Sequence, residues 1–222
     1  MIRFHNVTKM YPPKTMAVKN VTLEIGQGEF VSLVGTSGAG KTTLAKLLIA
    51  QERPTVGKIY AGDFEVTRLR RGELPFFRRQ IGVVFQDFKL LNKKTVFENV
   101  AFALEVCGAP PKRIEQVVPA VLNIVGLGNK LTNFPYELSG GEQQRVVIAR
   151  ALVHQPKVII ADEPTGNLDS INAQDVIDVL LKINGFGTTV ILVTHNREIV
   201  NGLKKRVVLM HQGEIMSDKA KG

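Results

Sequence analysis

The chain has 222 residues, of which 44% are hydrophobic and 22% are charged, as in ordinary globular domains. No run approaches the roughly 18 apolar residues of a spanning helix, and the N-terminus lacks secretory-signal features, so we expect a soluble protein. Lys and Arg number 29 against 20 Asp and Glu, in short clusters without interleaved aromatic residues; a solvated surface or a nearby acidic membrane explains this excess better than nucleic acid.

Short apolar runs alternate with helical segments along most of the chain. A helix is expected at 43–50, and buried strands are expected at 30–34, 81–85, 157–161 and 189–193. Continuous β-branched runs of this kind predict an α/β fold with a mostly parallel sheet that is covered on both faces. The segments 18–25 and 57–60 instead favour an antiparallel β subdomain.

The stretch 87–155 interrupts this alternation. Its spacing predicts helices at 96–106, 112–125 and 141–154, with no strand between them. We interpret it as a helical subdomain inserted into a single domain, 1–222, whose core spans about 1–86 and 156–222. Cys107, the only cysteine, follows an apolar run and is interpreted as a small core residue.

A glycine-rich segment between the first buried strand and the following helix matches a phosphate-binding loop. It reads Gly35, Thr36, Ser37, Gly38, Ala39, Gly40, Lys41, Thr42, and Thr43 continues into the helix. In such a loop the backbone N–H groups and the helix N-terminus bind phosphate oxygens. Lys41 should reach the β and γ phosphates of ATP, and the Thr42 hydroxyl should ligate Mg²⁺.

The apolar strand 157–161 ends in two acids. Its carboxyl end should place Asp162 beside the phosphate loop as an Mg²⁺ ligand, and Glu163 should polarise the attacking water. Alone, this pattern is as compatible with a surface turn. Together with the phosphate loop, it indicates nucleotide hydrolysis.

A second anion site is indicated at Ser139, Gly140 and Gly141. Ser139 can cap a helix, and Glu142 stands three residues on, as in a capping box. A well-capped helix would explain this alone. One chain has no evident use for two γ-phosphate sites, however, unless the second serves another copy.

At this point the sequence resembles the ATP-binding cassette family, whose signature is Leu-Ser-Gly-Gly-Gln; here Glu142 replaces the Gln. The resemblance implies that Tyr11 stacks on adenine, although a partly buried surface tyrosine is the competing interpretation. It also implies that Gln86 senses Mg²⁺, that Asp169 lines a dimer interface and that His195 contacts the γ phosphate. The implied cofactors are ATP and Mg²⁺.

The family resemblance also implies a head-to-tail homodimer that drives an integral membrane partner. The segment 87–91 and the residues that follow it would form the groove for that partner, or simply the core of the helical subdomain. The sequences 84–91, 95–104 and 161–169 look most like the cell-division branch of the family. That branch would imply the membrane protein FtsX as partner, a position at the cytoplasmic face of the plasma membrane at the division site, and control of cell-wall hydrolysis.

Other readings stay open. The main alternative is the ATPase subunit of a lipoprotein-release or macrolide/peptide exporter. Soluble cassettes of DNA repair or translation are disfavoured, because the chain shows neither a long coiled-coil insertion nor a second cassette. A module that senses ATP without cleaving it is also disfavoured, since Lys41, Asp162, Glu163 and His195 are all present.

Overall fold

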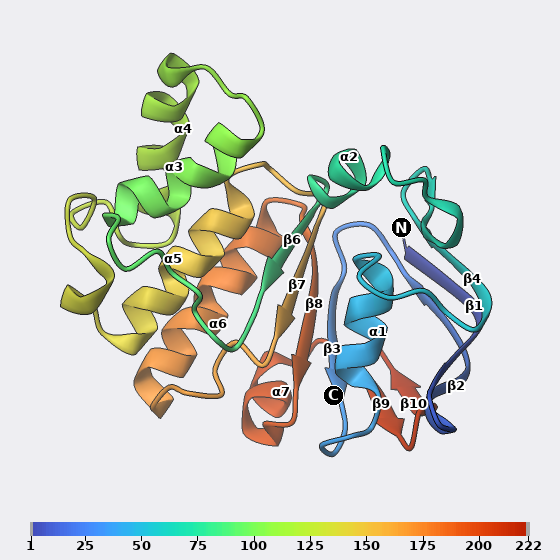
Figure 1. The fold of residues 1–222 in the computed structure, drawn as a ribbon. Helices are drawn as coiled ribbons and strands as arrows, with labels where there is room; N and C mark the ends of the chain where they lie inside the picture. Colours follow the sequence, from blue (N-terminus) through green and yellow to red (C-terminus); the bar gives the residue numbers. More distant parts are fainter. Residues whose placement is uncertain (1, 221–222) are drawn as a thin grey trace.

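The protein is represented by a computed structural model that describes residues 2–220. Two sheets form its framework (Figure 1). The larger sheet has the strand order β10-β9-β3-β8-β7-β6, and the smaller has the order β2-β1-β4-β5. The bounds of the large-sheet strands are β3 Phe30–Val34, β6 Ile81–Val84, β7 Val158–Asp162, β8 Thr189–Thr194, β9 Arg206–His211 and β10 Glu214–Lys219.

Five strands of the large sheet run parallel, and only β10 pairs with its neighbour in the antiparallel sense. The predicted mostly parallel sheet is therefore confirmed. The small sheet is antiparallel, as expected for the early segments, and consists of β1 Ile2–Tyr11, β2 Thr15–Ile25, β4 Val56–Ala61 and β5 Phe64–Glu65.

Helices cover one face of the large sheet (Figure 1). They are α3 Val96–Val106, α4 Pro111–Ile124, α5 Gly140–Leu152 and α6 Ser170–Gly185. Alternate strand residues such as Ile159, Ala161 and Leu192 point into the apolar core beneath them. We call this face the helical layer. Three of its helices, α3 to α5, lie in the chain between β6 and β7, and α5 also packs against β6 and α6.

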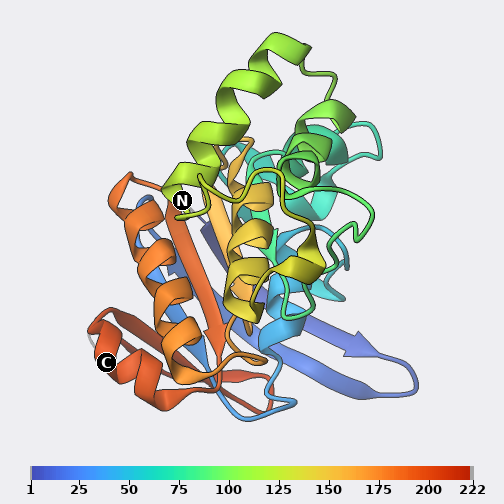
Figure 2. The same cartoon turned by 90° about the vertical axis from the view of Figure 1, so that its left-hand side faces the viewer.

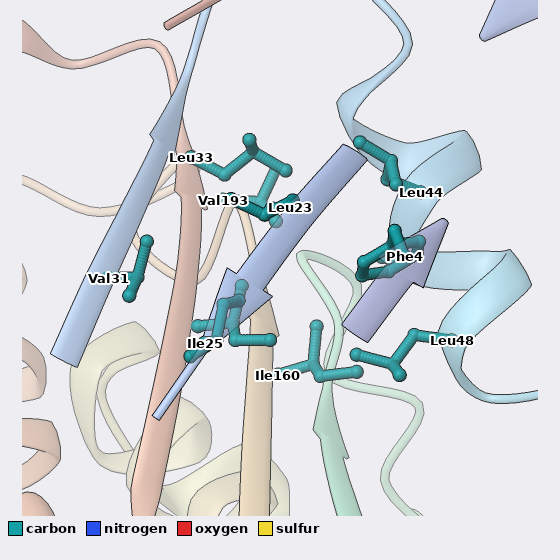
Figure 3. A pocket seen from close by; sticks show the side chains of 11 residues that line it. Phe4, Leu23, Ile25, Val31, Leu33, Leu44, Leu48, Ile160 and Val193 are labelled. Carbon is teal, nitrogen blue, oxygen red and sulfur yellow. The ribbon is translucent and has the colours of Figure 1, made fainter. Parts of the chain in front are cut away.

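The opposite face carries α1 Lys41–Leu48, α2 Leu74–Arg78 and the small sheet. A cavity of about 20 Å³ lies in this second core, between side chains such as Phe4, Leu44 and Ile160 (Figure 3). Its lining is apolar and offers a water no hydrogen-bond partners, so the cavity is a packing gap and not a ligand site. The remaining helix, α7 Arg197–Leu203, follows β8.

Most predicted elements are present within one or two residues of their expected ends, which is the usual spread of helix and strand bounds. Two expectations about single residues were wrong. Phe85 lies outside β6 and is exposed, because the chain leaves the edge of the sheet there to reach the site. Cys107 caps the end of α3 and is only partly buried, because it stands at the corner where the chain turns towards α4.

Candidate active site

The phosphate-binding loop connects β3 to α1 at the carboxyl edge of the large sheet. Gly40 has a φ of +100° and precedes the first helical residue, Lys41. A Cβ on Gly40 would stand 2.3 Å from the carbonyl oxygen of Ala17, so only glycine fits here. The loop is thus held against β2, and its backbone curls in front of the N-terminus of α1.

Lys41 and Thr42 begin α1 and point to different partners. The Lys41 side chain is buried, and its ammonium group donates to the carbonyl oxygens of Gly35 at 2.9 Å and Thr36 at 3.2 Å. The Thr42 hydroxyl donates to Oδ1 of Asp162 at 3.3 Å. This last bond joins the phosphate loop to the end of β7, as the sequence predicted for these two residues.

The two acids that end β7 differ in their surroundings. Burial raises the pKa of Asp162, and the nearby Glu163 charge adds to the rise, while the Thr42 hydrogen bond opposes it. Glu163 has a φ of +50°, which is uncommon for a non-glycine residue, and its N–H donates to the carbonyl oxygen of Val193 at 2.8 Å. A left-handed backbone at a site residue typically serves to aim its side chain.

Two residues that follow one another at the end of β8 hold the Glu163 carboxylate. Nδ1 of His195 lies 2.8 Å from Oε1 of Glu163, and the Thr194 hydroxyl donates to Oε2 at 3.4 Å. The sequence pointed to His195 but not to Thr194, whose part in the site depends on a contact between neighbouring strands. Glu163 and His195 thus form a pair of groups that can hold or move a proton.

Gln86 follows β6 and enters the site from the side of the helical layer. Its Nε2 donates to Oδ1 of Asn167 at 3.2 Å, and its side chain packs against Gly166. Asn167 was not among the predicted site residues. The pair links the loop after β6 to the loop between β7 and α6.

One open depression joins several of these groups. It is lined by the entire phosphate loop with Thr42 and Thr43, by Gln86, Glu163 and His195, and by side chains of α7, β9 and β10. Six candidate residues are not part of this lining: Tyr11, Ser139, Gly140, Gly141, Asp162 and Asp169. Asp162 still reaches the phosphate loop through its bond to Thr42.

Ser139, Gly140 and Gly141 form the turn at the start of α5, in which Ser139 is exposed, Gly140 is partly buried and Gly141 is buried. The predicted capping box is confirmed, because Oγ of Ser139 accepts from the N–H of Glu142 at 3.2 Å and the Glu142 carboxylate accepts from the N–H of Ser139 at 2.9 Å. The Ser139 N–H bond also lowers the pKa of Glu142.

Asp169 caps the neighbouring helix α6. Its carboxylate accepts from the N–H and the side-chain amide of Asn172, and these bonds lower its pKa. Asn172 in turn packs against Gly141, where a Cβ would meet it at 2.2 Å. The Ser139–Gly141 turn and the Asp169 loop are therefore one packed unit on the helical layer.

Tyr11 stands at the end of β1, in the hairpin that projects from the body in Figure 2. The Lys9 ammonium group lies 4.8 Å from its ring centroid. Ala17 on the other strand of the same hairpin contacts the phosphate loop and lines the depression, whereas Tyr11 does not line it.

The oxygen groups beside the phosphate loop fit a magnesium ion. The hydroxyl of Thr42 and the carboxylate of Asp162 are already in contact, and Gln86 offers an amide oxygen in the adjoining depression. Within residues 2–220, no three His, Cys, Asp or Glu side chains gather as a metal cage. This fits an ion that takes other ligands from substrate phosphates and water.

Nothing between residues 2 and 220 forms a helix both long and apolar enough to span a bilayer.

Comparisons with known proteins agree with this geometry. The chain is 51% identical over 222 residues to the cell division ATP-binding protein FtsE of Bacillus subtilis, covering all of this chain and 97% of that one. It is 45% identical to the FtsE of Escherichia coli K12, with 97% of each chain covered. Among solved structures, a dimeric ATP-binding cassette in a post-hydrolysis state, bound to ADP and Pi, superposes with a TM-score of 0.88 at 35% identity, covering 99% of this chain and 98% of that one.

A further solved relative is a cassette of the cbiONQ transporter complex from Clostridium perfringens, with a TM-score of 0.92 at 28% identity, covering 99% of this chain and 88% of that one. The model of the ABC transporter family matches residues 18–166, which include the phosphate loop, both acids and the Ser139–Gly141 turn. By its fold, its site and its full-length relatives, the chain belongs to the ABC transporter family, as an ATPase cassette.

Proposed function

We propose that this chain is the ATP-hydrolysing subunit of a cell-division complex, in which two copies act head to tail and drive an integral membrane partner, FtsX. The observation that carries the cell-division role is the 51% identity to FtsE over the full chain. The joined Thr42–Asp162 and Glu163–His195 pairs at the phosphate loop support the hydrolytic role.

In the proposed reaction, the loop N–H groups and Lys41 bind the phosphates of ATP. Lys41 would exchange the carbonyl oxygens that it now contacts for phosphate oxygens. Thr42, Asp162 and Gln86 would hold Mg²⁺, which neutralises phosphate charge when bound. Glu163 would orient the attacking water and accept its proton, and His195 would donate to the γ phosphate once it leaves Oε1 of Glu163.

The second copy completes the site in this proposal. Ser139 to Gly141 do not line the depression of their own chain, yet they stand at a helix N-terminus whose cap, Ser139, is exposed, and a helix N-terminus suits an anion. In a head-to-tail pair each copy would supply this turn to the other, as a symmetric dimer allows. The dimeric state of the solved relative with ADP and Pi supports this arrangement.

Glu163→Gln tests the hydrolytic role. The variant should bind ATP and dimerise on it, while its rate of phosphate release falls by about 100-fold or more, because an amide cannot accept the proton of the water. Size-exclusion chromatography with ATP measures the dimer, and Lys41→Ala, which should lose most ATP affinity, is the control for binding. Undiminished turnover of Glu163→Gln would remove Glu163 from the mechanism.

The partner surface is proposed on the exposed apolar side chains of loop 85–91 and α3. Phe85, Leu91 and Phe102 are between 36% and 44% exposed, whereas Val96 and Val100 of the same region are core. The exposed side chains support a docking surface, and the buried ones support the alternative that this region is core of the helical subdomain.

Co-purification tests this surface and the identity of the partner. Phe102→Glu should abolish capture of FtsX from detergent-solubilised membranes, because a carboxylate would enter an apolar contact. Phe186→Glu, at an exposed phenylalanine at the end of α6, should capture FtsX normally. A different polytopic protein in the wild-type eluate, identified by mass, would favour the export or lipoprotein-release alternative.

A further inference from the structure

The loop of residues 85–91, between β6 and α3, is fastened to α5 by side chains that donate to its backbone. Gln144 donates through Nε2 to the carbonyl oxygen of Phe85 at 3.3 Å. Arg150 donates through its two terminal nitrogens, at 3.1 Å to the carbonyl oxygen of Phe88 and at 2.9 Å to that of Lys89. Three of the seven loop carbonyl groups are therefore bound by a single helix.

Arg150 is unusual because its charged group is withdrawn from water without a carboxylate partner in the described part of the chain. Its guanidinium is largely withdrawn from water, and burial lowers its pKa. Among residues 2–220 it forms no ion pair with a carboxylate. A withdrawn charge without a counter-charge is costly, so its two carbonyl bonds are what hold it there. Lys89, one of the bound residues, has a φ of +46°, which is strained for a residue with a Cβ.

The loop and α5 meet a second time, at the N-terminus of the helix. Cζ of Phe88 lies 3.9 Å from the position that a Cβ on Gly140 would take. At its start, the loop carries Gln86 into the nucleotide depression, and at its end Leu91 is bound through both its N–H and its carbonyl group to the buried Asn99 of α3. The loop thus touches the depression, the Ser139–Gly141 turn and the helical layer within seven residues.

We propose that Arg150 is a positioning residue that makes loop 85–91 and α5 move as one body, so that displacement of Gln86 by nucleotide displaces the Ser139–Gly141 turn. This inference rests on the proposed function in one respect: only there does a displaced Ser139–Gly141 turn affect the ATP site of the second copy. The mechanical link itself rests on the contacts of Arg150, and Gln86 alone would not provide it.

The side chain of Gln144 gives a reason why loop 85–91 could take a second position relative to α5. The residue is fully buried, and its Oε1 has no hydrogen-bond partner among the described residues. A buried acceptor without a donor disfavours the present arrangement. A shift of the loop that brings a donor to this oxygen would therefore be favoured.

Limited trypsin digestion tests the link directly, because Lys89 is exposed and Arg150 binds the carbonyl group of the bond that trypsin would cut. Arg150→Met keeps an unbranched apolar side chain, although a shorter one, and removes every donor. We expect cleavage after Lys89 to accelerate by about tenfold, as loss of charge-assisted bonds would give. Arg150→Lys, whose shorter side chain keeps the charge but lacks the planar fork of the guanidinium, should give an intermediate rate.

Kinetics then separate positioning from binding. In complex with the membrane partner, Arg150→Met should lower kcat by about tenfold and leave KM and the equilibrium affinity for ATP within about twofold. Lys182→Met is the matched control: Lys182 also donates to a backbone carbonyl, that of Ile124, but it does not touch the loop. This control should change neither the cleavage at Lys89 nor kcat.

Wild-type cleavage after Lys89 and wild-type kcat in both Arg150 variants would overturn the proposal. A kcat that falls together with ATP affinity would do so as well, since it would mean general damage to the site. If Arg150→Met does not fold, as judged by its melting curve, Arg150→Lys decides. A wild-type chain that never hydrolyses ATP would refute the proposed function, while the digestion would still decide the link.

Discussion

The Asp162 carboxyl group lies at the end of β7, where burial raises its pKa above the value of an unfolded chain. Above the folded pKa, the native state holds an ion that the unfolded chain solvates better, so this ion opposes folding at neutral pH. Well below the unfolded pKa of about 3.9, the group is protonated in both states and the effect disappears. The ionised Asp162 carboxylate therefore lowers the free energy of unfolding, and its role lies in the site.

Asp162→Asn should raise the melting temperature at pH 7 by a few degrees, and the gain should shrink as the pH falls through the folded pKa. Asp169→Asn is the opposite case. Its carboxylate has a lowered pKa, so it stabilises the fold at neutral pH and loses that effect in acid, and the variant should melt lower at pH 7. Melting curves from pH 3 to pH 8 would show whether the two variants change the melting temperature in opposite directions. A lower melting temperature for Asp162→Asn at pH 7 would contradict the raised pKa of Asp162.

At the scale of the element, α5 depends on its closeness to α6. Gly141→Ala should lower the free energy of unfolding by about 1–3 kcal/mol, because the added Cβ meets Asn172 at 2.2 Å. In the Asn172→Ala background the same change should cost much less, so the two substitutions should be non-additive in urea titrations. Gly185→Ala, at a helical glycine with open space around it, should stabilise the protein by about 0.4–1 kcal/mol. Additive costs at 141 and 172 would refute the contact.

At the scale of the whole molecule, the head-to-tail dimer can be tested by mixing two inactive variants. Lys41→Ala disables the phosphate loop. Ser139→Asp keeps a good helix cap but places a negative charge where the partner's γ phosphate would bind. A mixed dimer would contain one intact composite site, so a 1:1 mixture should recover about a quarter of the wild-type phosphate release. No recovery, in a mixture shown to form mixed dimers, would contradict the arrangement.

The sequence predicted those parts of the fold and site that depend on patterns of neighbouring residues. Buried strands such as 30–34 are continuous apolar runs, and the phosphate loop and capping box are fixed spacings of a few residues. Strand β10 was not predicted, because Glu214–Lys219 is an edge strand with exposed polar positions and no apolar run. A two-sided buried strand has a pattern to detect, and an exposed edge strand does not.

Contacts between distant side chains and backbone were beyond prediction. Arg150 and Lys89 are 61 residues apart, and Gln86 and Asn167 are 81 apart. Their pairing depends on how α5 and the loops pack, and no local spacing encodes it. Thr194 was missed for the same reason, although it stands next to the predicted His195.

The chain contains one cysteine, and it is partly exposed at the end of α3, on the helical layer opposite α1. A maleimide dye would therefore attach at a single place without any prior removal of thiols. A second cysteine in the β1–β2 hairpin would give a donor–acceptor pair across the sheet. Energy transfer between the two labels would then report, in real time, any change in the distance between the end of α3 and the hairpin when ATP is added.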